Sequence, residues 1–186
     1  MTGLATVLQR LALIGGALFC GTTALASENM TAAPIVALEF GVICDYRPQG
    51  VDVEAPDTNA GRIRRGGDPI TFDIATDQVP ALLGTAFGIR MLAEEEMGER
   101  IVTMVTRHPS FGPGYRDTES WPSELTGGIY SARYFYFEFD YELAPGLWSM
   151  EVWLEDRMIV RQDFTVHGGA AARKILDQCP TEGLTS

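Results

Sequence analysis

Few side chains in this chain are suited to covalent catalysis, because its 186 residues include three cysteines and two histidines. A serine or cysteine nucleophile needs a nearby base, and no G-x-S-x-G motif is present. His108 precedes Pro109 at a predicted strand end, where a histidine commonly bonds to backbone, and His167 follows the last predicted strand. We therefore predict no catalytic residue and no enzyme activity.

Metal and cofactor binding are predicted to be absent as well. A zinc site uses three or four nitrogen or sulfur ligands, which two isolated histidines do not provide. The acidic run 94–99 offers oxygen ligands for calcium, but it lacks the spacing of a calcium loop and is more typical of a solvated turn. Paired carboxylates can hydrolyse glycosides, and Asp117, Glu119 and Glu124 are candidates for that alternative.

Two groups of side chains could instead bind a ligand. Arg62, Arg64 and Arg65 form a basic spot in an acidic chain, either a docking site or solvated loop charge. His108 and Trp121 lie in a second irregular segment, and we take all five as speculative binding-loop residues. A further set of aromatic side chains is either an exposed binding patch or core: Tyr134, Tyr136 and Trp153.

The first 26 residues resemble a signal peptide. A short apolar run follows Arg10 and ends in Ala24-Leu25-Ala26, a motif of small residues that predicts cleavage after Ala26. The run is too short to span a bilayer, which takes roughly 20 residues. We expect a periplasmic or secreted protein with no stable membrane insertion after cleavage.

Cysteine usage agrees with export. Cys20 leaves with the signal, and the remaining pair, Cys44 and Cys179, is predicted to form a disulfide in an oxidising compartment. The alternative is two unpaired thiols. The formal net charge of −11 disfavours nucleic acid and anionic membrane surfaces as partners.

The rest of the chain is dominated by a period of two, typical of strands. We expect a flexible segment over 27–33, one domain over 34–180 and a disordered tail over 181–186. The strands are expected in the following segments: 35–44, 70–74, 85–91, 101–107, 130–141, 148–154 and 158–166. The Pro- and Gly-rich stretches 47–68 and 108–128 are predicted to be long loops, and 170–178 a short helix.

About seven short strands without helices between them predict an all-β fold, an antiparallel immunoglobulin-like β-sandwich. The sequence also resembles an exported bacterial family, domain of unknown function 3859. The similarity rests on these segments: 39–44 (EFGVIC), 84–89 (GTAFGI), 106–109 (TRHP), 139–148 (FDYELAPGLW) and 164–166 (FTV). The resemblance implies a small periplasmic β domain and supplies no substrate, cofactor or site residue.

Our functional hypothesis is a non-catalytic binding or interaction module of the bacterial periplasm, with an unidentified protein or glycan as partner. Its binding surface is expected on the 59–67 loop or on the 108–128 loop. The alternative is a hydrolase of envelope glycans or peptides, which requires two carboxyl groups converging in a cleft with one pKa raised.

Overall fold

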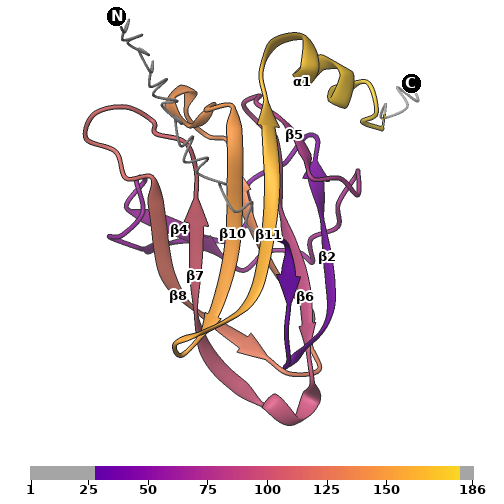
Figure 1. The fold of residues 1–186 in the computed structure, drawn as a ribbon, viewed down its shortest axis with the longest axis vertical. Helices are drawn as coiled ribbons and strands as arrows, with labels where there is room; N and C mark the ends of the chain where they lie inside the picture. The colour runs from indigo at the N-terminus through magenta and orange to yellow at the C-terminus, as the bar shows by residue number, and fades with distance from the viewer. Residues whose placement is uncertain (1–27, 181–186) are drawn as a thin grey trace, which may run out of the picture.

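Two antiparallel sheets pack face to face in the computed structural model, which describes residues 28–180 (Figure 1). The order of the larger sheet is β1 (Met30–Thr31), β11 (Arg157–His167), β10 (Gly146–Leu154), β7 (Glu99–Arg107) and β8 (Thr118–Thr126), and β5 (Gln78–Pro80) also pairs with β11. The smaller sheet has the order β2 (Ile35–Ile43), β6 (Ala86–Ala93) and β9 (Ser131–Tyr136). The predicted all-β sandwich is confirmed, with one parallel pair, β5–β11.

The core lies between the sheets and is rich in aromatic side chains. Phe87 on β6 is fully buried, and its ring packs against Trp148 and Phe164 at centroid distances of 5.6 and 5.0 Å. Such edge-to-face contacts add to the burial of large apolar surfaces. Alternate residues of β10 and β11 supply this layer. Burial alternates along much of β11, whereas in β10 the intervening Ser149 and Glu151 are buried as well.

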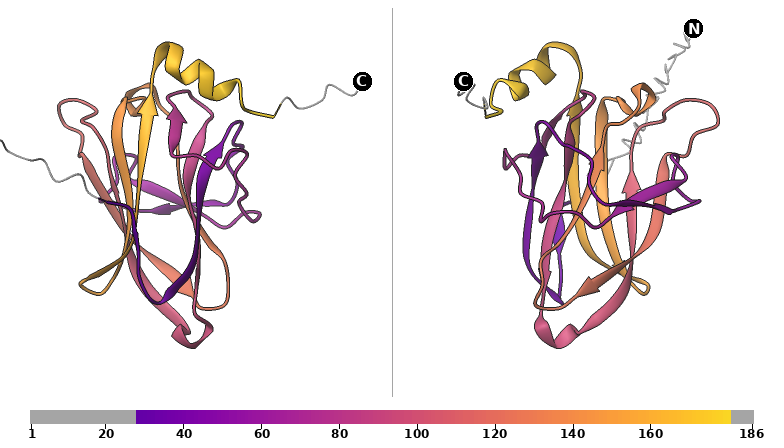
Figure 2. Two further views of the ribbon diagram at one scale, coloured as in Figure 1. Left: turned by 45° about the vertical axis from the view of Figure 1, so that its right-hand side comes forward. Right: turned by 180° about the vertical axis from the view of Figure 1, so that it is seen from behind.

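The β10–β11 hairpin was predicted correctly. Glu155 adopts a positive φ of 55° in the turn, and Arg157 begins the returning strand. The short helix is also present, as α1 (Gly169–Leu176), which lies over one end of the sandwich beside β5 (Figure 2). The predicted disulfide is confirmed, since Cys44 after β2 is bonded to Cys179 after α1 with a Cα–Cα distance of 6.0 Å.

Three predictions about the chain between the strands need correction. The stretch 47–68 is not a plain loop, because it forms a separate two-stranded hairpin of β3 (Val51–Glu54) and β4 (Arg62–Arg65). The stretch 108–128 contains strand β8. The segment 70–74 is not a strand: Ile74 alone forms a bridge, to Val42, and the Asp73 carboxylate accepts a hydrogen bond from the Cys44 amide.

Two short 3-10 helices complete the chain: η1 (Glu95–Met97) and η2 (Asp140–Glu142). Within the predicted flexible segment, Met30 and Thr31 form β1, which is paired with Arg161 and Val160 of β11. The predicted signal peptide and the tail 181–186 lie outside the described residues. In the part of the chain that the structure describes, no helix is both long and apolar enough to cross a membrane.

Candidate functional site

Strand β8 is an edge strand, and its outward backbone groups are bound by other parts of the chain. Ser120 donates its amide hydrogen to Asp57 O at 3.3 Å, and the carbonyl groups of Pro122 and Glu124 accept hydrogen bonds from arginines. The backbone nitrogen atoms and C=O groups at positions 120, 122 and 124 therefore point away from β7. Proline lacks an amide hydrogen, but at a position whose nitrogen faces away from the paired strand it breaks no hydrogen bond of the sheet. Pro122 is therefore tolerated in β8, where we expected a loop.

The β3–β4 hairpin lies across this side of the sandwich, as the rear view in Figure 2 shows. Asn59, in the connection between its strands, donates from its amide and from Nδ2 to the two carboxylate oxygens of Glu119, at 2.7 and 3.1 Å. Arg62 of β4 donates to Glu138 at 3.0 and 3.1 Å. Polar contacts thus fix the hairpin over the seam between β8 and β9.

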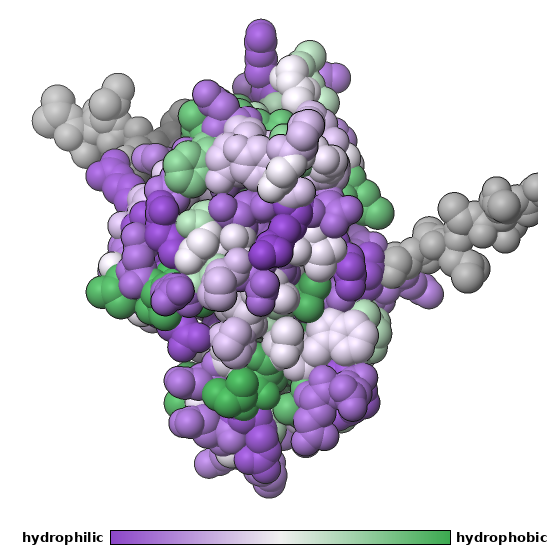
Figure 3. Space-filling view, turned by 90° about the vertical axis from the view of Figure 1, so that its left-hand side faces the viewer, coloured by the Kyte–Doolittle hydropathy of each residue, from purple (hydrophilic) through white to green (hydrophobic). Residues whose placement is uncertain are grey.

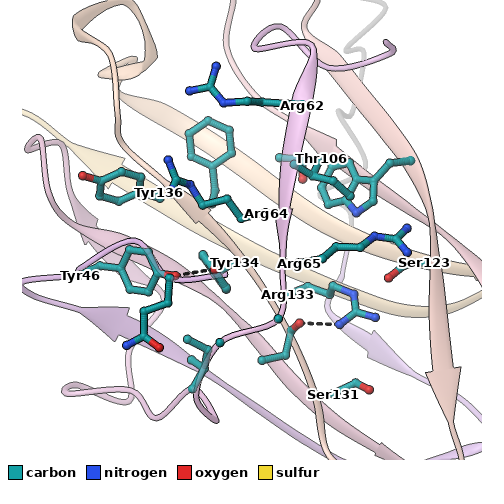
Figure 4. A pocket seen from close by; sticks show the side chains of 18 of the residues that line it. Tyr46, Arg62, Arg64, Arg65, Thr106, Ser123, Ser131, Arg133, Tyr134 and Tyr136 are labelled. Carbon is teal, nitrogen blue, oxygen red and sulfur yellow. Dashed lines mark hydrogen bonds between the residues drawn. The ribbon is translucent and has the colours of Figure 1, made fainter. Parts of the chain in front are cut away.

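A cavity of about 530 Å³ lies under the hairpin, and Figure 4 shows its interior. This volume falls within the usual range for small-molecule sites, roughly 300–1,000 Å³. The hairpin, the inner face of β8 and strand β9 together form its walls. Its polar and aromatic lining includes Arg62, Arg64, Arg65, Arg133, Tyr46, Tyr134, Tyr136, Trp121, Ser123 and Ser131.

The arginines at one end of the cavity are paired with carboxylates. Arg62 and Arg64 contact Asp52 and Glu138 at nitrogen–oxygen distances of 3.0–3.6 Å. These side chains are partly exposed, so each pair adds little to stability. Their charges are balanced before any ligand enters.

The positive charges of Arg65 and Arg133, at the other end of the cavity, are not paired with carboxylates among the described residues. Among the described residues, neither has a carboxylate oxygen within 4.0 Å. Burial lowers the pKa of Arg133, and the nearby charge of Arg65 lowers it further. Both guanidinium groups instead donate to backbone oxygens: Arg65 to Pro122 at 2.8 Å, and Arg133 to Glu124 at 2.7 Å.

Tyrosines form the aromatic part of the lining. The hydroxyl groups of Tyr46 and Tyr134 share a hydrogen bond, and the Tyr46 ring lies 4.9 and 5.3 Å from those of Tyr134 and Tyr136. Burial, followed by the bond to Tyr46, raises the pKa of Tyr134 well above its usual range. This cluster includes two of the three residues for which the sequence left open either an aromatic patch or a core position. Trp153 belongs to the other sheet, where it donates to Glu151.

Two buried carboxyl groups also face the cavity, Glu119 and Glu142. Burial raises the pKa of Glu142 to about 7, against hydrogen bonds from the Phe139 and Glu138 amides that lower it, and the charge of Glu119 adds to the rise. Of the carboxylates predicted for a hydrolase, Glu119 and Glu124 line the cavity, and Asp117 is exposed outside it.

The structure brings four of the five predicted binding residues together, from two segments far apart in sequence: Arg62, Arg64, Arg65 and Trp121. His108 does not join them. Its side chain is fully buried and stacked on Phe111, with its Nε2 3.1 Å from Glu119 Oε1. It therefore positions Glu119 and is not available to a ligand.

Sequence reasoning did not single out Arg133, Tyr46 or Glu142. Arg133 lies in an aromatic strand pattern that gave no reason to choose one cation. The surface of this side of the molecule is mostly hydrophilic, with small separate apolar patches (Figure 3). Over residues 28–180, no group of three or more His, Cys, Asp and Glu side chains is arranged to hold a metal.

Comparison with known proteins identifies the family of the chain. None of the curated proteins compared with the chain matches it. A crystal structure of a protein from Pseudomonas aeruginosa described as immunoglobulin-like is similar, with 20% identity and a TM-score of 0.47 over 76% of this chain and 98% of that one. Residues 33–166 match the family described as domain of unknown function DUF3859. The match spans most of the chain and confirms the predicted resemblance: this protein belongs to the DUF3859 family.

Proposed function

We propose that this protein is a non-catalytic binding module of the bacterial periplasm and that the cavity under the β3–β4 hairpin binds a glycan. The cavity itself carries the proposal, because it combines ring faces with fixed hydrogen-bond donors. Tyrosine and tryptophan faces suit the apolar sides of sugar rings, and a few placed polar groups fix orientation in most ligand sites.

Placement in the periplasm is supported by two features. The Cys44–Cys179 disulfide suits an oxidising compartment, and the first 26 residues have the pattern of a cleaved signal peptide. The acidic composition disfavours nucleic acid. A glycan of the cell envelope fits both the compartment and the cavity.

The proposal is tested by isothermal titration calorimetry with two envelope-type disaccharides: neutral chitobiose and N-acetylglucosaminyl-N-acetylmuramic acid. We expect Tyr136→Ala to weaken binding of both by about tenfold, or roughly 1.4 kcal/mol, from lost ring contact. Tyr115→Ala is the matched control, because Tyr115 is exposed and outside the cavity lining. If neither disaccharide binds, or both variants behave alike, the glycan proposal fails.

A hydrolase is the second candidate, favoured by the raised pKa of Glu142 beside Glu119. Both carboxylates, however, are held by structural hydrogen bonds. Glu119 accepts from Asn59 and contacts His108, and Glu142 accepts from two backbone amides of its own turn. Glycan fragments released on incubation with the protein, and lost in Glu142→Gln, would support the hydrolase over the binding module.

A further inference from the structure

We propose that Arg65 and Arg133 form an oxyanion subsite, so that the ligand of this cavity is an acidic saccharide carrying a carboxylate or phosphate group. This inference rests on the proposed glycan function and specifies its ligand class. It concerns the end of the cavity lined by Ser123 and Ser131, which Figure 4 shows beside the two guanidinium groups.

Unused hydrogen-bond donors are the first argument. The Nε atoms of Arg65 and Arg133 are buried, and neither has a hydrogen-bond partner in the part of the chain that the structure describes. Leaving a buried donor without a partner is unfavourable, and more so for a charged group. A bound oxyanion would bring acceptors to the two guanidinium groups, and arginine suits it because its fork binds carboxylate and phosphate through two bonds.

Charge is the second argument. The protein carries a net charge of −11, yet these two cations have no carboxylate within 4.0 Å among the described residues. Burial is the main cause of the lowered pKa of Arg133, the charge of Arg65 lowers this pKa further, and the more distant Glu124 acts against both. An oxyanion between the two cations would relieve their repulsion in a partly desolvated site, where charge interactions are stronger than in water.

Position is the third argument. Arg65 comes from the hairpin and Arg133 from β9, but both are held by carbonyl groups of β8 that lie two residues apart. A strand rises about 3.3 Å per residue, which places these anchor points about 7 Å apart. Both forks can then reach one oxyanion between them. Holding the side chains in place before binding lowers the entropy lost when a ligand arrives.

The test compares the same two disaccharides with N-acetylglucosamine 1-phosphate, using the purified protein. We expect one or both acidic compounds to bind at least about tenfold more tightly than chitobiose. In Arg65→Gln or Arg133→Gln the preference for the acidic compound over chitobiose should fall to within about twofold. Arg100→Gln is the control, because it removes the same charge from an exposed side chain outside the cavity.

A second measurement does not depend on the variants folding normally. In NMR spectra of the unaltered protein, the Nε–Hε signals of Arg65 and Arg133 should shift when the preferred acidic compound binds, and that of Arg100 should not. The more tightly bound acid identifies carboxylate or phosphate as the group. Equal affinities for acidic and neutral sugars, with unmoved arginine signals, would overturn the subsite and leave the glycan proposal standing. If no sugar binds but inorganic phosphate shifts both signals, the subsite stands and the glycan proposal fails.

Discussion

Glu142 should make the protein less stable as pH rises through neutrality. Its side chain is buried in the lining of the cavity, where it accepts hydrogen bonds from the Glu138 and Phe139 amides at 2.7 and 2.9 Å. Burial nonetheless raises its pKa from 4.5 to about 7. The folded protein therefore binds the proton of this group more tightly than the unfolded chain does.

The sign and size follow from proton linkage. Below pH 4.5 the group is protonated in both states, so its full stabilising contribution is present. Between pH 4.5 and 7 the unfolded chain releases the proton first, so the free energy of unfolding falls, and above 7 the contribution is lost. At 1.36 kcal/mol per pH unit the total loss has an upper limit of about 3 kcal/mol.

Urea unfolding at pH 5, 6, 7 and 8 would measure this effect in the wild type and in Glu142→Gln, which stays neutral. From pH 5 to pH 8, we expect the free energy of unfolding of Glu142→Gln to rise by about 2–3 kcal/mol relative to that of the wild type. Glu96→Gln is the control, because Glu96 is exposed and the same charge is removed. If the two unfolding curves keep a constant separation at every pH, the reasoning about Glu142 is refuted.

Three further predictions concern the fold and the hairpin. Replacing Cys44 and Cys179 by alanine should lower the free energy of unfolding by up to about 5 kcal/mol, since the bond closes a loop with a separation of 135 residues; an unchanged urea midpoint would contradict this. Gly88→Ala places a methyl group 2.1 Å from the Arg133 carbonyl oxygen, so it should cost roughly 1–3 kcal/mol and weaken binding of the acidic sugar, whereas a wild-type thermal midpoint would show that β9 yields without cost. Glu119→Gln should speed amide hydrogen exchange in the β3–β4 hairpin with little change in β10 and β11, because the Glu119 carboxylate accepts two hydrogen bonds from Asn59 in the hairpin connection; equal rates would mean that the other contacts suffice.

The sandwich was predictable where strands pack on the core. Trp148, Met150 and Val152 alternate with the polar residues Ser149 and Glu151, and the returning strand also has a period of two, so the hairpin is evident from periodicity. The β3–β4 hairpin was missed because it lies outside the two main sheets and its strands are only four residues long, with Val51 and Val53 the sole apolar residues of β3 and Ile63 that of β4. Strand β8 was missed because Pro122 is a strand breaker except where its nitrogen faces away from the paired neighbour.

The candidate site was predictable only in part, because its residues meet through tertiary structure. Arg65 and Trp121 were singled out, but nothing in a single sequence places strand β4, which carries Arg65, beside strand β8, which carries Trp121. Arg133 is a candidate because no carboxylate oxygen lies within 4.0 Å of it among the described residues, and this is a property of the folded chain. His108 was a binding candidate by type and place, and burial against Phe111 removes it from the surface.

The way Asp57, Arg65 and Arg133 occupy the outward backbone of β8 has a consequence for self-association. An uncovered edge strand is a template on which a second molecule can extend the sheet. In this protein, two arginine side chains and the backbone of the crossing hairpin bond to the outward groups of β8 and so block such pairing. Any condition that releases the hairpin, such as mutation of its anchors, would therefore open both the cavity and a route to dimers joined strand to strand.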